Sequence, residues 1–169
     1  MLILKYINIC LIIVVSAYIG FYKSKKFSDR VKNLKDFKSG LSVFKSKIEF
    51  TYEPIKDIFE EISRVVYQEK ENVFKSFCEF KNSEDVSLAW NEAVENSNLC
   101  LKDDDKEVLC LLGKMLGKTD KTGQISQIDL VDNFLDKQIS DSEEEKRKNE
   151  KLYKTLGVIG GLVIAIILV

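Results

Sequence analysis

Histidine is absent from this chain of 169 residues. Without an imidazole the chain can form neither a Ser–His–Asp triad nor a Cys–His pair, and most types of zinc site lose a ligand. Proline occurs once and glycine only eight times. So few turn-forming residues favour long helices over a sheet with many turns. These scarcities predict an all-α protein and exclude the histidine-dependent classes of enzyme.

The cysteines lack the C-x-x-C spacing that is typical of metal and redox sites. The chain has four of them, Cys10, Cys78, Cys100 and Cys110. Cys10 lies in an apolar run, and the others lie beside apolar positions of expected helices. In a reducing cytosol such cysteines usually act as small buried hydrophobic residues, and we interpret them so.

An excess of charge of either sign is also lacking, because 26 basic residues stand against 27 acidic residues. Lys5 is the only charged residue outside 23–155, so this middle segment carries 25 basic residues (26 less Lys5) and 27 acidic ones, a net charge near −2. Nucleic-acid binding requires a concentrated basic face. The mixed, nearly neutral surface therefore predicts no nucleic-acid partner.

A first apolar segment covers residues 1–22 and is long enough to cross a membrane. About twenty helical residues at ~1.5 Å each span the ~30 Å hydrocarbon core of a bilayer. A cleaved signal peptide is the alternative, since Val15-Ser16-Ala17 resembles a cleavage site. The apolar run continues beyond that site, and the basic cluster that begins at Lys23 is typical of the cytosolic flank of a retained anchor. We therefore expect residues 1–22 to form a transmembrane helix.

A second apolar segment lies at the C-terminal end. Residues 152–169 supply ~27 Å of helix and follow a basic cluster between Lys146 and Lys154, which again indicates a cytosolic flank. A buried helix of a soluble protein is the alternative, but residues 162–169 are apolar on every face. The sequence thus predicts a membrane hairpin with both termini outside the cytosol and residues 23–151 inside it.

The segment 23–151 is expected to fold as a cytosolic bundle of about six helices, whose first and last helices continue into the membrane. Phe27, Leu34, Leu41 and Ile48 recur every seven residues, a spacing typical of a helix that packs on another helix. A dimeric coiled coil is the alternative to packing within one chain. The alternate positions of this stripe are Val31, Phe37 and Phe44.

The remaining helices are predicted from their end signals and apolar faces. The end signals are Pro54 for the second helix, Asn82 or Ser83 for the fourth, Asp103 and Gly117 for the fifth, and Asp120 for the sixth. The apolar faces are Ile55, Ile58, Phe59, Ile62 and Val65; Val73, Phe74, Phe77 and Phe80; Val86, Ala89, Trp90, Ala93 and Val94; Val108, Leu109, Leu112, Met115 and Leu116; and Ile125, Ile128, Val131, Phe134, Leu135 and Ile139. The expected core includes Leu34, Leu41, Ile48, Trp90, Leu109 and Leu112. Residues 140–151 are charged on all sides and are expected to form a solvated stalk.

Both expected membrane helices carry small residues four positions apart, Ser16 with Gly20 and Gly157 with Gly161. This spacing lets two helix backbones approach closely. Gly20 and Gly157 each lie three residues from a flanking lysine, so we expect the two small faces to meet at the same depth in the bilayer. Chance spacing and contact with another subunit are the alternatives.

The run Gly113-Lys-Met-Leu-Gly117-Lys118-Thr119 resembles a nucleotide-binding P-loop. It has three residues rather than four between its glycines, and it ends a helix instead of opening one. Close packing and a helix stop are the simpler interpretation of the two glycines. The run 103–105 of three aspartates lacks the ligand spacing of a calcium loop and suits a helix N-terminus. The sequence predicts no catalytic residue, no cofactor site and no metal site.

An ordered set of residues over the full length is more specific than any single motif. In the C-terminal half it comprises Asp105-x-Glu107-x-Leu109, Leu112-Gly113-x-x-Leu116-Gly117-x-x-Asp120, Gln124 and Lys148-x-x-Lys151-x-Tyr153-x-x-Leu156-Gly157-Val158-x-Gly160. In the N-terminal half it comprises Arg30, Leu34, Leu41, Ile48, Pro54 and the pair Ala89-Trp90. With these residues the chain resembles the stage III sporulation protein AB family. It departs from the family where Glu53 stands in place of a threonine, which removes a good helix cap, and where Lys47 stands in place of a glutamate.

The resemblance implies a component of the sporulation channel between mother cell and forespore, located in the mother-cell membrane that faces the forespore. Members of the family are similar to the inner-membrane platform proteins of type II secretion systems. The implied partners are the membrane and the other stage III sporulation channel proteins, including the cytosolic sporulation ATPase, with no small-molecule substrate. The resemblance therefore implies a non-enzymatic assembly platform.

Two other functions stay open. A membrane-tethered enzyme could use residues 113–119 to bind a nucleotide, and a two-helix membrane sensor or adaptor could relay a signal. The enzyme would need a nucleotide site, and the sensor would need a ligand cavity in the bundle.

Overall fold

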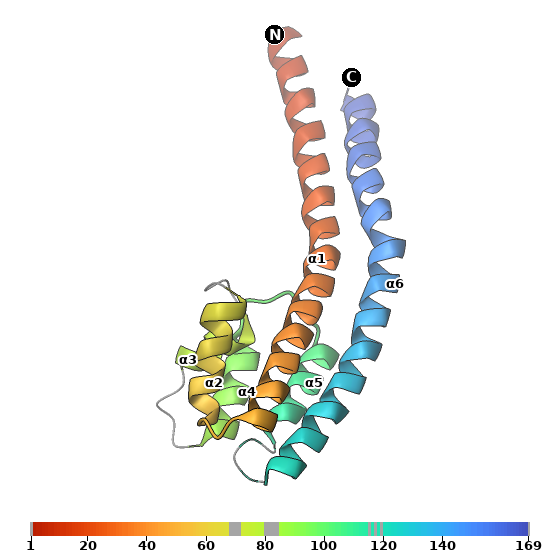
Figure 1. Cartoon of the computed structure of the whole chain (residues 1–169). Coiled ribbons are helices and arrows are strands. Elements are labelled where there is room, and N and C mark those ends of the chain that lie inside the picture. The colour runs from red at the N-terminus through yellow and green to blue at the C-terminus, as the bar shows by residue number, and fades with distance from the viewer. Residues whose placement is uncertain are drawn as a thin grey trace. The chain divides into compact units, whose positions relative to one another are not determined.

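The structure is a computed structural model that describes residues 2–67, 72–79, 85–114, 116, 118 and 120–168. These residues form helices and short connections, with no strand among them, so the prediction of an all-α fold with about six helices is confirmed. The elements are α1 (Leu2–Phe50), α2 (Ile55–Glu61), the π-helical turn η1 (Ile62–Val66), α3 (Val73–Glu79), α4 (Val86–Asn96), α5 (Asp103–Gly113) and α6 (Lys121–Leu168) (Figure 1).

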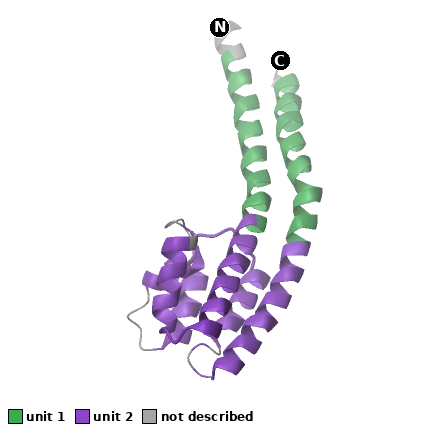
Figure 2. Ribbon diagram, viewed as in Figure 1, with its two compact units in different colours: residues 1–31, 141–169 green, residues 32–140 purple. Residues whose placement is uncertain are grey.

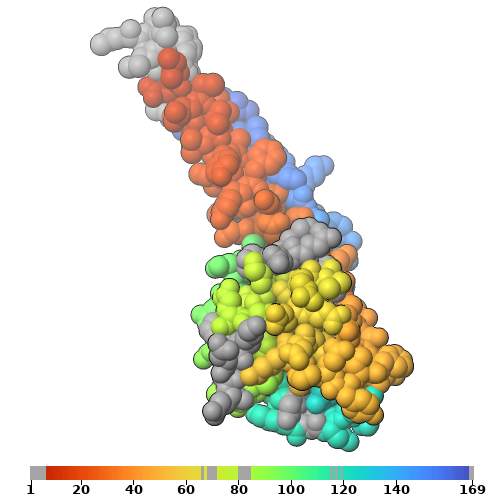
Figure 3. All heavy atoms as spheres, turned by 60° about the vertical axis from the view of Figure 1, so that its left-hand side comes forward, coloured from red at the N-terminus to blue at the C-terminus, as the bar shows by residue number. Residues whose placement is uncertain are grey.

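The chain forms two compact units, which Figure 2 shows in different colours. Unit 1 consists of residues 1–31 and 141–169, which include the first part of α1 and the last part of α6. Unit 2 consists of residues 32–140 and holds the rest of both long helices together with α2 to α5. Figures 1 and 3 show the two segments of unit 1 side by side.

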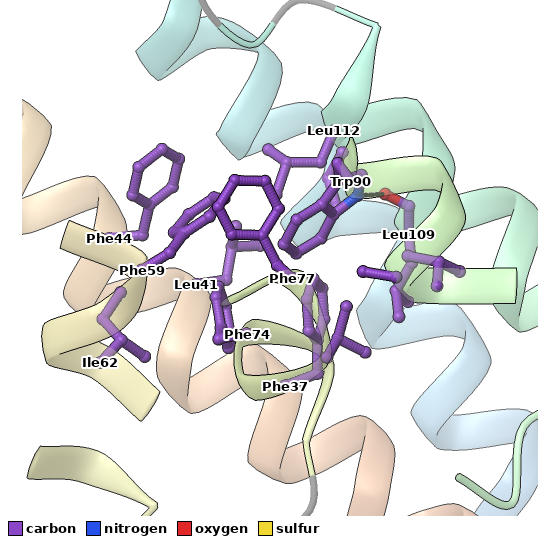
Figure 4. Packing of buried hydrophobic residues seen from close by; sticks show 14 of the residues in the cluster. Phe37, Leu41, Phe44, Phe59, Ile62, Phe74, Phe77, Trp90, Leu109 and Leu112 are labelled. Carbon is purple, nitrogen blue, oxygen red and sulfur yellow. Dashed lines mark hydrogen bonds between the residues drawn. The ribbon is translucent and has the colours of Figure 1, made fainter. Parts of the chain in front are cut away.

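The core of unit 2 is built around two fully buried aromatic side chains, Phe59 of α2 and Trp90 of α4 (Figure 4). Their ring centroids lie 5.0 Å apart, and the Phe59 centroid lies 4.7 Å from that of Phe44 and 5.0 Å from that of Phe77. Tilted and edge-on pairs of this kind each contribute about 0.5–1.5 kcal/mol beyond simple burial. The Trp90 Nε1–H also donates to the Leu109 carbonyl oxygen at 2.8 Å.

The heptad stripe of α1 enters this core from one side. Phe37 stacks on Phe74 of α3, with ring centroids 5.5 Å apart, and Leu34 and Phe44 have no exposed surface. Within unit 2 the stripe therefore packs on other helices of the same chain. The residues expected in the core are each at most 9% exposed: Leu34, Leu41, Ile48, Trp90, Leu109 and Leu112.

A tyrosine hydroxyl lies inside the hydrogen-bond ladder of α1. The Gly40 N–H donates to the Tyr67 Oη at 3.1 Å, and the Tyr67 hydroxyl donates to the Asp36 carbonyl oxygen. In an undisturbed helix the Gly40 N–H would donate to that same carbonyl. A Cβ atom at position 40 would overlap Tyr67 and lie 2.5 Å from Cε2 of Phe74, so only glycine leaves room. Burial raises the pKa of the Tyr67 hydroxyl, which stays protonated and can donate.

Gly113 lies at the last position of α5 and allows this helix to approach α4 closely. A Cβ atom there would lie 2.7 Å from Cδ1 of Trp90 and 2.9 Å from Oδ1 of Asn91. The first glycine of the P-loop-like run is therefore packed against the core.

Three helix starts differ from the sequence expectations. Pro54 is the N-cap of α2 rather than its first residue. Asp85 caps α4, and its Oδ1 accepts from the Ser87 N–H at 2.7 Å. Several polar residues precede this helix, and composition alone does not select among them. The N-cap of α5 is Lys102, not Asp103, and the Lys102 N–H donates to the Asp105 carboxylate at 2.9 Å.

Two apolar residues expected on buried faces are exposed. Val65 is 63% exposed because it lies in η1, whose wider turn carries it off the stripe that α2 begins. Phe134 is 42% exposed, since Val131 and Leu135 already fill the buried seam of α6. Asp120 precedes α6 as expected, and its Oδ1 accepts from the Gly123 N–H at 2.9 Å.

The cysteines are also less buried than expected. Cys10 is exposed on α1, and Cys78, Cys100 and Cys110 are partly buried. Partial burial raises the pKa of the Cys110 thiol, which favours the unreactive protonated form. Expectations for Phe80, Asn82, Ser83, Met115, Gly117 and Thr119 fall outside the described residues.

Candidate functional site

The candidate site is the contact between α1 and α6 in unit 1, where four small residues meet. The Ser16 hydroxyl donates to the Gly157 carbonyl oxygen at 2.7 Å. The Gly157 carbonyl oxygen therefore accepts a hydrogen bond from the neighbouring helix. Such bonds between helices contribute about 1 kcal/mol in an apolar surrounding.

Gly20 and Gly157 bring the two backbones into direct contact. A Cβ atom on Gly20 would lie 2.6 Å from the Tyr153 carbonyl oxygen and 2.8 Å from Cα of Gly157. A Cβ atom on Gly157 would lie 2.8 Å from Cα of Gly20 and 2.9 Å from the Ser16 carbonyl oxygen. Backbone atoms cannot yield as side chains can, so any larger residue at either position would push the helices apart.

Gly161 extends the contact by one turn. A Cβ atom there would lie 3.0 Å from Cα of Ile13 and 3.0 Å from Cβ of Ser16. At Gly160 the nearest atom would be the Ser16 Oγ at 3.7 Å, an ordinary contact distance. The structure thus brings Ser16, Gly20, Gly157 and Gly161 together and leaves Gly160 at the margin.

The outward surface of unit 1 is apolar. Among the described residues, one helix is long and apolar enough to cross a membrane: Ile7–Phe50 of α1 contains a window with a mean hydropathy of 1.7, of which 11% is buried. On α6 large apolar side chains also point outward, and Ile166 and Ile167 are 75% and 77% exposed. Water is a poor solvent for such a surface, whereas the interior of a bilayer is a good one.

Aromatic and charged groups follow the apolar surface along both helices. The ring of Phe27 stacks on that of Tyr153, with centroids 5.5 Å apart and an interplanar angle of 24°. The Lys23 ammonium lies 5.8 Å from the centroid of the same tyrosine ring, within the range of a cation–π interaction. Tyr153 therefore joins α1 and α6 at the level where the apolar surface ends.

A buried ion pair lies further along the same two helices. The Arg30 guanidinium donates to the Glu145 carboxylate at 2.7 Å, and their side chains are 9% and 25% exposed. Ser142 is buried beside this level, with 1% of its surface exposed. The solvated stalk expected at residues 140–151 is therefore wrong at these two positions, because Glu145 pairs with Arg30 of α1 and Ser142 is buried. The sequence marks Arg30 as a basic residue and as part of the family pattern, but it gives no sign of the partner Glu145.

Unit 2 carries a second set of ion pairs, between α1 and α6. Lys38 lies 3.3 Å from the Asp132 carboxylate and 2.5 Å from that of Asp136. Lys45 lies 2.5 Å from the Asp129 carboxylate. The hydrogen bond to Asp136 raises the pKa of Lys38, and that to Asp129 raises the pKa of Lys45. The seven-residue spacing of the lysines matches that of Asp129 and Asp136, a signal that becomes readable once α1 and α6 are known to pair.

The described residues offer little to a ligand. They contain no group of three His, Cys, Asp or Glu side chains that could hold a metal ion. A cavity beside Tyr67 and Asn72 measures about 10 Å³, which is about the size needed for one water molecule. Asp103 and Asp104 are exposed, while Asp105 is buried in its bond to the start of α5. No site for a nucleotide emerges from the part of residues 113–119 that the structure describes.

Comparison with known proteins identifies relatives over the full length. The family model described as "Stage III sporulation protein AB" matches residues 5–169. The Stage III sporulation protein AB of Bacillus subtilis (strain 168) is 27% identical over 169 residues, which cover 98% of this chain and 99% of that protein. A solved structure of Stage III sporulation protein AB superposes with a TM-score of 0.63 at 22% identity, covering 71% of this chain and 98% of that one. The last similarity concerns the fold alone.

Proposed function

Since the chain belongs to the stage III sporulation protein AB family, we propose that it is a non-enzymatic membrane platform component of a sporulation complex. The observation that carries the proposal is the contact of Gly20 with Gly157 under an apolar outer surface. A packed helix pair that exposes apolar side chains on its outside suits a bilayer and would be unstable in water.

The proposed topology is a two-pass hairpin in the mother-cell membrane that faces the forespore. Residues 1–22 and 152–169 form its spans, both termini lie outside the cytosol, and residues 23–151 lie inside. The basic residues that follow the first span and precede the second support this direction. The large exposed apolar side chains between Leu156 and Ile167 support the second span.

The proposed partners are the other stage III sporulation channel proteins, including a cytosolic ATPase that docks on residues 23–151. In this arrangement the complex resembles a secretion system, and the platform holds an enzyme that supplies the energy. The family membership supports a role in a sporulation complex, and the packed core of unit 2 suits a protein that works through its surface. Purification of the tagged full chain from sporulating cells should bring the ATPase with it; purification of the intact complex without it contradicts the docking.

The topology is tested by cysteine labelling in the plasma membrane of a bacterial host. In a background with the native cysteines replaced by alanine, Asp104→Cys introduces an exposed thiol in the expected cytosolic region. A second variant carries a cysteine appended after Val169. A membrane-impermeant maleimide added to intact cells should label the appended cysteine and leave position 104 unlabelled until the cells are opened. The reverse pattern rules out the hairpin.

A further inference from the structure

Five lysines surround unit 1 where its apolar surface ends, and we call this set the lysine collar. It consists of Lys23, Lys25 and Lys26 on α1 and of Lys151 and Lys154 on α6. The contacts between the helices put these residues at one level, because Gly20 faces the Tyr153 carbonyl and Lys23 lies over the Tyr153 ring. Side chains from two distant parts of the sequence therefore contribute to one basic surface.

Most of the collar has no carboxylate partner. Lys154 bonds to Glu150 at 2.7 Å. Among the described residues, no carboxylate lies within ion-pair distance of Lys23, Lys25, Lys26 or Lys151, and these four side chains are exposed. This differs from unit 2, where the Lys38 and Lys45 ammonium groups already contact aspartates. The collar thus presents unneutralised positive charge.

On α1 tyrosines precede the collar lysines, and on α6 Tyr153 lies between the two lysines of the collar. The Lys26 ammonium lies 5.3 Å from the Tyr22 ring centroid, and the Lys23 ammonium lies 5.8 Å from that of Tyr153. Tyr18, one turn before Tyr22, is 71% exposed. Along α1 the order is apolar side chains, tyrosines and then lysines, which matches the order of acyl chains, glycerol and phosphate in a phospholipid.

We propose that the lysine collar binds the phosphate groups of anionic phospholipids and so selects the lipids around this hairpin. The proposal rests on the membrane insertion proposed above and names the lipid class that this protein recruits. The apolar surface holds the acyl chains and the collar holds the head group, so the ligand is the whole lipid. A soluble phosphate would contact only the exposed lysines and would lack the contact between acyl chains and the apolar surface that adds to the affinity of a lipid.

The expected strength follows from the attraction of basic side chains to an anionic surface. One lysine near such a surface changes the affinity by up to about fivefold at low salt, and the effect decreases as salt screens it. The full-length protein is reconstituted in phosphatidylcholine vesicles that contain spin-labelled phosphatidylglycerol or spin-labelled phosphatidylcholine. Electron paramagnetic resonance then gives the ratio in which the two labelled lipids occupy the protein surface.

The wild-type protein should prefer phosphatidylglycerol severalfold. The double variant Lys25→Gln with Lys151→Gln should lose at least threefold of this preference, on the scale of about fivefold for each lysine. The matched control, Lys118→Gln with Lys137→Gln, removes the same charge from exposed positions of unit 2 and should keep the preference. Inorganic phosphate should weaken the preference no more than sodium chloride at the same ionic strength, because both act only by screening.

Three outcomes overturn the inference and a fourth separates it from the proposed function. Equal occupancy by the two lipids in an inserted protein contradicts the collar, and so does an equal loss in both double variants. Competition by phosphate beyond that of matched salt would identify a soluble-anion surface instead. Resistance to extraction by carbonate is measured in parallel, and a chain that is extracted contradicts the proposed membrane insertion itself.

Discussion

The Lys47 ammonium lies 3.6 Å from the Glu53 carboxylate, which belongs to the connection between α1 and α2. Lys47 also bonds to Glu61 at 2.7 Å. One lysine thus links the end of α1, the connection to α2 and the end of α2. Glu53 precedes the N-cap residue Pro54, so a threonine at this position would not be the cap that the sequence suggested.

The first prediction concerns the pH dependence of this link. The hydrogen bond to Glu61 raises the pKa of Lys47 from its ordinary value of 10.5. A raised lysine pKa contributes stability below the unfolded-state value and loses it as the pH rises through the folded-state value. Lys47→Gln should therefore lower the melting temperature slightly at pH 7, and the difference from wild type should vanish well above pH 10.5. A difference that persists there would show that packing of the lysine stem, rather than its charge, is responsible.

The second prediction concerns the buried pair of Arg30 and Glu145. Glu145→Gln removes the carboxylate that the guanidinium of a 9%-exposed side chain contacts at 2.7 Å, and breaking a buried pair costs roughly 3–5 kcal/mol. Because Glu145 keeps a quarter of its surface, we expect a cost at the lower end of this scale. Glu144→Gln is the matched control, since it removes an exposed carboxylate one position away. Thermal unfolding in detergent should show a much larger loss for position 145, and equal losses contradict the prediction.

The third prediction concerns Trp90. Trp90→Ala removes a fully buried indole that contacts Phe59 and Phe74, and such truncations cost about 3–5 kcal/mol. Leu88→Ala, on the exposed side of the same helix, should cost little. Denaturant titration of the full chain in detergent measures both. A change for Trp90→Ala below about 1 kcal/mol would place this residue outside the folding core.

The fourth prediction tests the helix contact of unit 1 by crosslinking. Cysteines at Gly20 and Gly157 would themselves force the backbones apart, so Ser16→Cys with Gly160→Cys is the better pair: a Cβ on Gly160 lies 3.7 Å from the Ser16 Oγ. Mild oxidation should join them within one chain. Val15→Cys with Gly160→Cys is the control, because Val15 is 48% exposed and lies on the outward side. Crosslinks that form only between chains would assign this surface to another subunit.

The fifth prediction addresses the P-loop-like run. Replacing Lys118 and Thr119 with alanine should leave spore formation unchanged, because Lys118 is exposed and Gly113 is used for packing. Protein abundance on an immunoblot is the control. Loss of spore formation with the variant present at normal abundance would support the alternative that residues 113–119 bind a nucleotide.

The sequence predicts the long-range order of this fold well where periodicity determines it. The seven-residue stripe of α1 and the apolar sets of α4 and α5 follow from burial, which repeats with the helical period. Helix ends are less predictable, because Asp85 competes with several equally suitable residues before α4. The hydrogen bonds of the Tyr67 hydroxyl and the Arg30–Glu145 pair could not be predicted, since each joins groups that are far apart in the sequence. The small residues of unit 1 were visible as a spacing, although the hydrogen bond from Ser16 was not.

The position of the Tyr67 hydroxyl in the hydrogen-bond ladder of α1 allows the Gly40 amide proton to report on the contact between Tyr67 and this helix. The Gly40 amide is held by a side chain from outside its helix, whereas neighbouring amides depend on α1 alone. Its exchange with deuterated solvent therefore requires only that the tyrosine leave its place, and not that the helix unwind. The protection of this amide from hydrogen exchange, compared with that of its neighbours, gives the free energy with which the segment that ends at Tyr67 binds to α1. A partner that stabilises or destabilises the binding of that segment would change the exchange rate of the Gly40 amide before those of its neighbours.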